Sequence, residues 1–475
     1  MSFWTSDSIR AAVGGVWTAR PADDAPLTGV SIDSRTIQPG EVFFAFKGER
    51  FDGHDFVRAA VEAGAGMVVL EREAAAKGLP RAVGVARVAD ARKALIRLSK
   101  AYRKRLDGVK VIAVTGSVGK TTTVRLIEGA LSRKLRVTAS QKSFNNDIGV
   151  PLTLLRAKIG DQAIICEVGM NSPGEIATLG AILEPDVAVI TRIGRAHIGH
   201  LGSREAIARE KASLLTFLRP GGLAVIPADE PLLDDYAKTV PHVITFGAGD
   251  GADLRVSDIR SMPDDDGSGR IRFTINDRAV YEAPLLGEHN ALNAAAAIAV
   301  GRRLGLDEDA VRAGLSRATP PTNRMQVRRI GEVTVYNDAY NASPESTVAA
   351  VGTFGATAKD AHRRVIVLGD MRELGDFAEA AHAEVAEAIL RAGNIDLLIA
   401  VGPLAHHTAD RLRAEWPRER LAHLPDVEGL NAARAAGMLR PGDSVLLKGS
   451  RSMALEKVEQ ALTDRRTQQP APAAG

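Results

Sequence analysis

The sequence predicts an α/β protein with three domains. The chain has 475 residues, more than a single hydrophobic core usually organises. From residue 109 onward, short apolar runs rich in β-branched residues alternate with helical patterns, which is typical of a mostly parallel sheet. Two prolines in "RATPPTNRM" precede a third pattern. We therefore expect an N-terminal domain at 1–107, a central domain at 108–320, a C-terminal domain at 321–465 and a disordered tail at 466–475.

Each expected element follows from a local pattern. The stretch "GVSIDSRTIQPGEVFFAFKGERFDGHDF" mixes strand-like pieces with turn residues and indicates a small N-terminal α/β domain. Central strands are expected at "VKVIAV", "QAIICEV", "DVAVITRI", "GGLAVIPA" and "HVITFG". Between 253 and 285, polar and apolar residues alternate, which predicts an inserted β-hairpin, and "NALNAAAAIAVGRRLG" returns to helix. In the last domain, "RRVIVLGD", "IDLLIAVG" and "DSVLLKGS" predict the strands of a Rossmann-like, doubly wound sheet.

The charge balance excludes a general affinity for polyanions. The chain has 61 Lys and Arg against 58 Asp and Glu, a formal net charge of +3, so nucleic acid and anionic membranes are not expected partners. One stretch, "RKALIRLSKAYRKRL", is basic. Its apolar residues Leu95, Leu98, Tyr102 and Leu106 recur at helical spacing, which indicates an amphipathic helix with a solvated basic face.

Three further features indicate a cytoplasmic protein. The single cysteine, Cys166, excludes an internal disulfide framework and suits a reducing compartment. The start, "MSFWTSDSIRAAVGG", lacks the charged and apolar regions of a secretory signal. No apolar stretch approaches the roughly 20 residues that a membrane span needs.

A phosphate-binding loop is expected at "VTGSVGKTT". An apolar strand precedes it and a helical pattern follows, which is the context that makes such a match credible. Backbone N–H groups of the loop and the helix N-terminus would bind phosphate, with Lys120 adding a full positive charge and the Thr121 hydroxyl placed for Mg²⁺. The common pattern has a glycine separated by four residues from the Gly-Lys pair, where this chain has Val114. The alternative is a glycine-rich turn without a ligand.

Two side chains that follow strands are candidate metal ligands. Glu167 ends the strand of "AIICEVGM", the usual position of an acidic Mg²⁺ ligand, although it could instead cap a helix or pair with an arginine. His197 follows the strand "DVAVI", and its position leaves a metal-binding and a structural role equally open, whereas His200 is the weaker candidate. Lys211, taken alone, is expected on an exposed helix face without a role.

Taken together, these motifs resemble the Mur ligases, the ATP-dependent amide ligases of peptidoglycan precursor synthesis. "TGSVGKTT" is similar to the family's short phosphate loop, which also lacks the earlier glycine. "GEHNALNAAAAIAVG" resembles the family's G-x-H-N-x-x-N-x-x-A-A signature, and "NRM" and "NDAYNASPES" match its C-terminal stretches. The matches span the chain in the right order.

Within the family, "DAYNASPES", "VLGDMRELGD" and "LLKGSRSMALEKV" resemble the member that joins D-alanyl-D-alanine to UDP-N-acetylmuramoyl-tripeptide through an acyl phosphate. The alternative is the member that adds the third amino acid to UDP-N-acetylmuramoyl-dipeptide. That enzyme typically has Asp-Tyr-Ala-His in place of Asp-Ala-Tyr-Asn and a Gly-Lys-Gly-His-Glu stretch that is absent here. Folylpolyglutamate synthase lacks the N-terminal "SIDSR" domain, and a switch GTPase would need an Asn-Lys-x-Asp motif that the chain does not have. The third residue of the acceptor, diaminopimelate or lysine, stays open.

The resemblance also implies a site, position by position. ATP and two Mg²⁺ ions are the expected cofactors, and a monomer without a membrane span is expected. The ATP phosphates would contact Gly116, Ser117, Val118, Gly119, Lys120, Thr121 and Thr122, and the adenine region Asn290 and Asn293. Thr121 and Glu167 would hold one Mg²⁺, and His197 and an N-carbamylated Lys211 the second. Arg324 and Asp338 would reach the nucleotide from the C-terminal domain, whereas Tyr340, Asn341, Lys448 and Ser450 would line the side of the amine substrate. Ser34, Arg35, Asn145 and Asn146 would bind the UDP-sugar substrate.

The surroundings of Lys211 depart from the family pattern. A glutamate usually follows this lysine by two residues in the subfamily, and Ser213 stands there in this chain.

Overall fold

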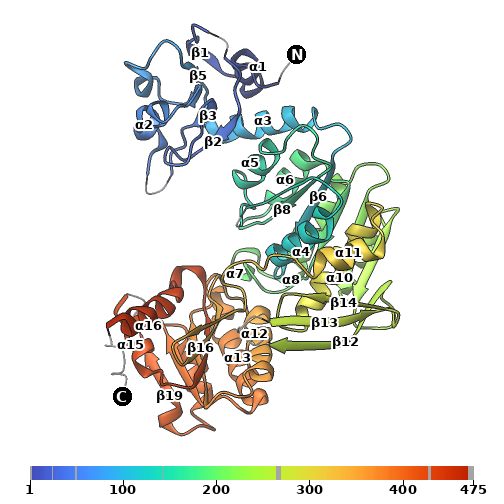
Figure 1. Ribbon diagram of the computed structural model, residues 1–475, viewed down its shortest axis with the longest axis vertical. Coiled ribbons are helices and arrows are strands. Elements are labelled where there is room, and N and C mark those ends of the chain that lie inside the picture. The colour runs from blue at the N-terminus through green and yellow to red at the C-terminus, as the bar shows by residue number, and fades with distance from the viewer. Residues whose placement is uncertain are drawn as a thin grey trace, which may run out of the picture.

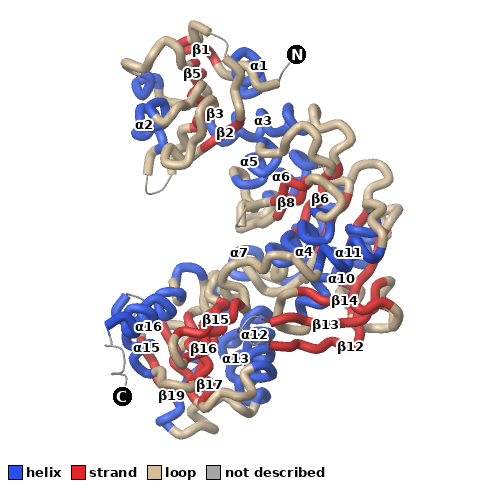
Figure 2. The backbone as a smooth tube through the Cα atoms, in the orientation of Figure 1, coloured by secondary structure: helices blue, strands red, loops and turns tan. Residues whose placement is uncertain are grey.

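The computed structural model describes residues 3–468 except 24, 49–50, 142, 264–268 and 426–428. It contains three sheets, and each lies within one of the three expected domain ranges. The domains follow one another along an arc, with the N-terminal domain at the top of Figure 1 and the C-terminal domain at the bottom. Figure 2 shows that helices cover the strands in each domain.

The N-terminal domain has a five-stranded sheet in the order β1-β5-β4-β3-β2, in which only the β1–β5 pair is antiparallel. Its strands are β1 (Val16–Ala19), β2 (Gly29–Ser31), β3 (Glu41–Phe44), β4 (Met67–Leu70) and β5 (Gly84–Arg87), and its helices are α1 (Ser6–Val13), α2 (Val57–Glu62) and α3 (Ala91–Arg103).

Helix α3 is the expected amphipathic helix and joins the first two domains. Leu95, Leu98 and Tyr102 are buried, as their spacing predicts. The basic side chains of α3 are exposed to solvent, as expected, with one exception. Arg103 is 5% exposed, and its guanidinium donates to the carbonyls of Leu183 and Glu184 in the central domain.

The central domain has a nine-stranded sheet in the order β14-β13-β12-β11-β10-β9-β6-β8-β7. Its strands are β6 (Lys110–Thr115), β7 (Val137–Ala139), β8 (Ala163–Glu167), β9 (Val187–Ile190), β10 (Leu223–Pro227), β11 (Val243–Gly247), β12 (Leu254–Pro263), β13 (Gly269–Ile275) and β14 (Ala279–Ala283). Its helices are α4 (Lys120–Ser132), α5 (Gly149–Leu155), α6 (Glu175–Leu183), α7 (Ile198–Leu201), α8 (Arg204–Ala212), α9 (Asp234–Ala237), α10 (His289–Arg303) and α11 (Glu308–Leu315).

The expected hairpin insertion is wrong in one respect. The segment forms three strands rather than two, and β12 pairs in parallel with β11 before β13 and β14 continue antiparallel. The segment therefore extends the central sheet. Alternation of polar and apolar residues indicates a half-buried strand, but it does not specify which neighbour that strand joins.

The C-terminal domain has a six-stranded sheet in the order β15-β16-β20-β17-β18-β19, parallel except for β15. Its strands are β15 (Gln326–Ile330), β16 (Val333–Asp338), β17 (Arg363–Gly369), β18 (Leu397–Val401), β19 (Leu421–Leu424) and β20 (Asp443–Lys448). Its helices are α12 (Pro344–Thr357), α13 (Ala378–Ala392), α14 (His406–Leu412), α15 (Gly429–Met438) and α16 (Glu456–Gln468). Helix α16 extends three residues into the expected tail, and 469–475 lie outside the described residues.

No helix in the described part of the chain is long and apolar enough to cross a membrane.

Candidate functional site

The phosphate loop joins β6 to α4, as expected. Gly116 and Gly119 have φ angles of 146° and 86°, which favour glycine, and a Cβ at Gly116 would lie 1.9 Å from Thr191 Oγ1. Val114 stands where the common pattern has its first glycine. In this chain β6 continues to Thr115 and is buried from Val111 onward, so position 114 belongs to the strand and not to the loop. No side chain caps the N-terminus of α4, so its first N–H groups are available to an anion. Lys120 Nζ donates to Gly116 O at 2.8 Å, beside the loop that it serves.

Glu167 ends β8 directly beside β6 and is 1% exposed. Its carboxylate accepts hydrogen bonds from Thr121 Oγ1 and Asn145 Nδ2, both at 2.8 Å. It forms no ion pair with an arginine in the described part of the chain, so the arginine alternative is not realised. The hydroxyl and carboxylate oxygens next to the phosphate loop are ligands that Mg²⁺ prefers.

Lys211 corrects an expectation. The helix face that carries it is buried, and the residue is 1% exposed on α8. No ion pair with a carboxylate is recorded for its ammonium among the described residues. Burial, together with the nearby charge of Lys120, lowers the pKa of Lys211 well below its ordinary value. The polar neighbours of Lys211 in the sequence indicate an exposed helix face. This face is buried because segments that lie far away in the sequence pack against α8.

His197 lies at the beginning of α7 and has a φ of 65°, unusual for a residue other than glycine. Its Nδ1 lies 2.7 Å from Glu373 Oε2 of the C-terminal domain, without the alignment of a linear hydrogen bond. The interaction with His197 lowers the pKa of Glu373. His200 is exposed and does not line the cleft described below.

The C-terminal domain brings its predicted residues to the phosphate loop. Arg324 Nη2 donates to Thr121 Oγ1 at 3.1 Å, and its guanidinium lies over the Tyr340 ring, 4.4 Å from the ring centre. Asp338 Oδ2 pairs with Lys448 Nζ at 2.6 Å. The backbone oxygen of Asn341 accepts a second hydrogen bond from the same ammonium, at 2.7 Å.

Asn290 and Asn293 lie against the other side of the loop. Asn293 Nδ2 donates to Asn290 Oδ1 at 2.9 Å, and a Cβ at Gly119 would lie 2.5 Å from Asn293 Oδ1. Beside them lies His289, which sequence reasoning missed even though it stands in the "GEHN" motif. Burial lowers the pKa of His289 to about 4, so its imidazole is neutral near pH 7.

These groups line one cleft of about 780 Å³ between the central and C-terminal domains. The predicted residues in its lining are Ser117, Val118, Gly119, Lys120, Thr121, Thr122, Asn145, Asn146, Glu167, His197, Lys211, Asn290, Asn293, Arg324, Asp338, Tyr340, Asn341, Lys448 and Ser450. Arg192, Arg372 and Glu373 also line it and were not among the predicted site residues, although Arg372 and Glu373 stand in the "VLGDMRELGD" stretch that resembles the family.

Three predicted residues lie outside this lining. Gly116 is in the loop but beneath its surface, whereas Ser34 and Arg35 belong to the N-terminal domain. Arg35 is exposed and pairs with Asp33 at 2.6 Å, which lowers the pKa of Asp33 to about 2. The structure therefore does not bring Ser34 and Arg35 together with Asn145 and Asn146 in this cleft.

The fold and the cleft define a phosphate-loop nucleotide-binding protein in which a second α/β domain faces the nucleotide site. Comparison with known families matches residues 26–105 to the Mur ligase family catalytic domain, 114–301 to the Mur ligase middle domain and 323–451 to the Mur ligase glutamate ligase domain. The chain belongs to the Mur ligase family.

Individual relatives share most of their length with this chain. The UDP-N-acetylmuramoyl-tripeptide–D-alanyl-D-alanine ligase of Bacillus subtilis is 35% identical over 97% of this chain and 98% of its own. The crystal structure of MurF from Acinetobacter baumannii is 30% identical, with a TM-score of 0.83 over 97% of this chain and 99% of its own. The MurF ligase from Thermotoga maritima in complex with ADP is 27% identical, with a TM-score of 0.76 over 93% of this chain and 98% of its own.

Proposed function

We propose that this protein is the ATP-dependent ligase that joins D-alanyl-D-alanine to UDP-N-acetylmuramoyl-tripeptide, a step of peptidoglycan precursor synthesis. The observation that carries the proposal is the shared cleft. The phosphate loop of one domain faces Arg324, Asp338 and the Lys448–Ser450 stretch of another. The names and the coverage of the relatives support the same reaction.

The reaction needs two steps because a carboxylate repels an incoming amine. The terminal carboxylate oxygen of the tripeptide attacks the γ-phosphorus of ATP, the bond to the β-phosphate oxygen breaks, and ADP leaves. The amine of D-alanyl-D-alanine then attacks the acyl carbon, the C–O bond to phosphate breaks, and the nitrogen loses a proton as the amide forms. Lys120 stabilises the negative charge of the transferring phosphoryl group, and the facing C-terminal domain excludes water from the acyl phosphate.

The residues present fit one Mg²⁺ without further change. Thr121 Oγ1 and Glu167 Oε2 lie 2.8 Å apart beside the phosphate loop, and Asn145 fixes the other oxygen of Glu167. Thr121 and Glu167 would hold the ion, which supplies positive charge to the phosphates when bound. His197 and Lys211 fit a second ion only if Lys211 is carbamylated, because an ammonium repels a cation. The described residues contain no cluster of three or more His, Cys, Asp and Glu side chains suited to a metal.

The carbamate at Lys211 is a separate proposal that the burial supports. A neutral amine adds CO₂ and releases a proton, and burial beside Lys120 favours the neutral amine. The resulting anion would face the positive charge of Lys120. ¹³C NMR of the apo protein in ¹³C-bicarbonate should show a carbamate signal that Lys211→Ala lacks. Lys211→Ala should lose most activity and regain part of it with a small carboxylate, whereas Lys211→Arg should not. A spectrum without the signal, or a fully active Lys211→Ala, would contradict the carbamate.

The remaining substrate assignments stay proposals. Ser34 and Arg35 of the N-terminal domain, with Asn145 and Asn146 at the cleft, would bind the UDP-sugar. Tyr340, Asn341, Lys448 and Ser450 would line the side of the dipeptide. One chain supplies the whole cleft, which supports a monomer. We expect the reaction in the cytoplasm, where ATP is available.

The test measures phosphate release from ATP by the purified protein. Release should require UDP-N-acetylmuramoyl-tripeptide and D-alanyl-D-alanine together, and Lys120→Ala should abolish it. Acceptors ending in diaminopimelate and in lysine are compared in parallel. Release that depends instead on UDP-N-acetylmuramoyl-dipeptide and a free diamino acid would overturn the proposal in favour of the ligase that adds the third residue.

A further inference from the structure

Two strained residues face each other where the central and C-terminal domains meet. His197 precedes α7 and Glu373 precedes the short 3₁₀ turn at Gly375–Phe377, and their φ angles are 65° and 66°. Residues other than glycine rarely adopt this conformation, and such strain concentrates at functional sites. Their side chains meet across the interface, with His197 Nδ1 lying 2.7 Å from Glu373 Oε2.

The backbones of the two domains also contact each other directly at this point. The N–H of Gly199 donates to Glu373 O at 3.1 Å. A Cβ at Gly199 would lie 2.8 Å from Glu373 O and 2.9 Å from Gly375 N, which is closer than Cβ atoms approach backbone atoms in proteins. The contact between the domains at this point therefore requires glycine.

The segment 194–199, which we call the strap, links this contact to the phosphate loop. Ser117 Oγ donates to Gly194 O at 3.1 Å and accepts the Gly194 N–H at 2.9 Å. Arg195, next in the strap, pairs with Glu345 at 2.8 Å and Glu384 at 2.7 Å, both on the C-terminal domain. One short segment thus touches the phosphate loop at one end and the C-terminal domain at the other. Figure 1 shows α7 between these domains.

Histidines that bind metals generally donate their second ring N–H to a carboxylate or carbonyl, which fixes the tautomer and the direction of the free nitrogen. His197 has such a carboxylate at Nδ1, and its ring also lines the cleft. A small rotation of the ring would align the 2.7 Å contact as a hydrogen bond and leave Nε2 to the cleft.

We propose that Glu373 is the positioning residue for His197. Because Glu373 belongs to the C-terminal domain, the imidazole is oriented only when that domain is docked on the strap. Docking therefore completes the cation site as well as closing the cleft. The metal-binding role of His197 rests on the proposed function, whereas the orientation of its ring does not.

The direct test is ¹⁵N NMR of histidine-labelled full-length protein without ligands, with His197 assigned by the signal missing from His197→Gln. In the parent, His197 should be the Nδ1–H tautomer. Glu373→Ala should lose this preference, and Glu373→Gln should retain it because an amide oxygen accepts the same hydrogen bond. Gly199→Val should also lose it, although Glu373 is intact, because the added side chain separates the backbones. An unchanged His197 signal in Glu373→Ala or in Gly199→Val would overturn the proposal.

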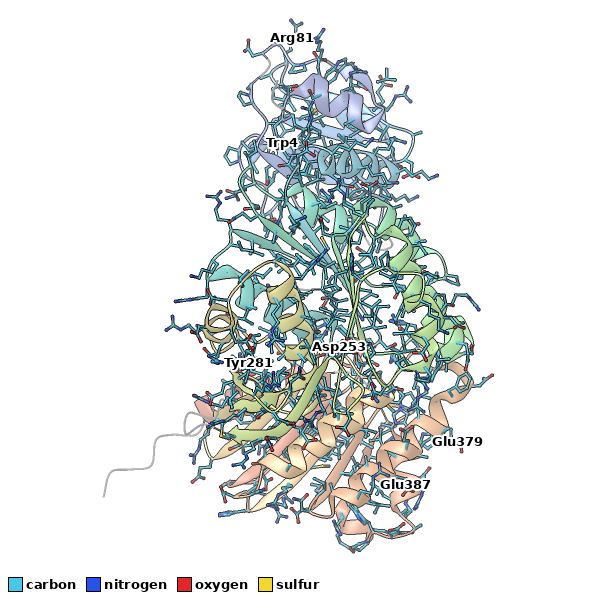
Figure 3. All side chains as sticks on the ribbon, turned by 90° about the vertical axis from the view of Figure 1, so that its right-hand side faces the viewer. Trp4, Arg81, Asp253, Tyr281, Glu379 and Glu387 are labelled. Atoms are coloured by element: carbon cyan, nitrogen blue, oxygen red, sulfur yellow. The ribbon has the colours of Figure 1, made fainter. Side chains whose placement is uncertain are left out.

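The control removes a carboxylate from the same interface without touching His197. Glu384→Ala leaves Arg195 its contact with Glu345 and should keep the parent tautomer. A surface control is Glu379→Ala, since Figure 3 shows Glu379 on the outer side of the C-terminal domain. In the assay of ATP-dependent ligation, Glu373→Ala should weaken the apparent affinity for Mg²⁺ by about 10–100-fold, whereas both controls should match the parent. If the parent protein shows no ligation, the proposed function is contradicted. The tautomer measurement still decides whether Glu373 orients His197.

Discussion

Two buried lysines in this protein should respond in opposite ways to the same substitution. Lys211 and Lys448 are 1% and 2% exposed, but among the described residues only Lys448 has a carboxylate partner, Asp338, at 2.6 Å. Methionine has a similar length and no charge, so it removes the ammonium and leaves little cavity. We expect Lys211→Met to stabilise the protein and Lys448→Met to destabilise it.

The magnitudes follow from the contacts that each lysine makes. Lys211 lines the cleft, so water still reaches part of its surroundings, and the cost of burying its unpaired ammonium is at the low end of the range for polar groups. Lys211→Met should therefore gain up to about 1 kcal/mol. At about 2–4 °C per kcal/mol for a domain of this size, the melting temperature of the central domain should rise by a few degrees. Lys448→Met leaves the carboxylate of Asp338, whose side chain is 14% exposed, with the N–H of Met325 and without its lysine partner. Breaking a buried pair costs about 3–5 kcal/mol, which predicts a fall of roughly 10 °C.

The assay is differential scanning calorimetry of the metal-free protein in degassed buffer, which keeps carbamate from forming. The parent and both variants are compared at equal concentration, with circular dichroism to check the fold. A melting temperature of Lys211→Met several degrees below the parent would refute the reasoning, since Lys211 would then make a stabilising contact. An unchanged melting temperature of Lys448→Met would show that the ion pair between Lys448 and Asp338 does not stabilise the fold.

The gain in stability of Lys211→Met over the parent should also depend on pH. Burial lowers the pKa of Lys211 in the folded state, whereas the unfolded chain keeps the ordinary value of 10.5. Between these two values the unfolded state binds a proton that the folded state does not, so the stability of the parent rises with pH. The methionine variant lacks this rise. Its advantage should therefore shrink from pH 7 toward pH 9.5, and a constant advantage would contradict the lowered pKa.

Three further predictions concern the nucleotide site. Lys120→Ala should abolish phosphate release and keep its melting temperature within a few degrees of the parent, because the Lys120 ammonium donates to a loop carbonyl, Gly116 O, and packs in no apolar core of the described residues; near-normal turnover would contradict the phosphate-loop assignment. Arg324→Ala and Asp338→Ala should each reduce ATP-dependent turnover by about 10²-fold although both lie on the other domain, and parent-like kinetics in both would contradict closure of the cleft. Gly116→Ala should lose ADP binding in calorimetry, since its Cβ would lie 1.9 Å from Thr191 Oγ1, and unchanged affinity would show that the loop tolerates the shift.

The phosphate loop illustrates what could be predicted from sequence. The strand, the loop and the helix are consecutive, so the glycines, Lys120 and Thr121 carry their own geometry in a short stretch of chain. The mostly parallel sheets of the central and C-terminal domains could likewise be expected from the alternation of apolar runs and helices. The family resemblance extended these local signals to residues such as Arg324 and Asp338, which no local pattern would have selected.

Contacts between distant segments could not be predicted. The burial of Lys211 and the pairing of β12 with β11 depend on segments that pack against them from elsewhere in the chain. Ser34 and Arg35 of the N-terminal domain were expected to bind the UDP-sugar with Asn145 and Asn146 of the central domain. Only the two asparagines line the cleft, and the shared role stays a prediction.

By itself, the sequence determined which chemical groups this protein has and the local backbone that presents the phosphate loop. Only the tertiary structure decided that His197 meets Glu373, 176 positions later in the chain, and that Lys448 rather than Lys211 has a carboxylate partner. The physical reason is that burial and ion pairing depend on distances in space. These are fixed by the packing of whole domains, which the spacing of residues along the chain does not specify.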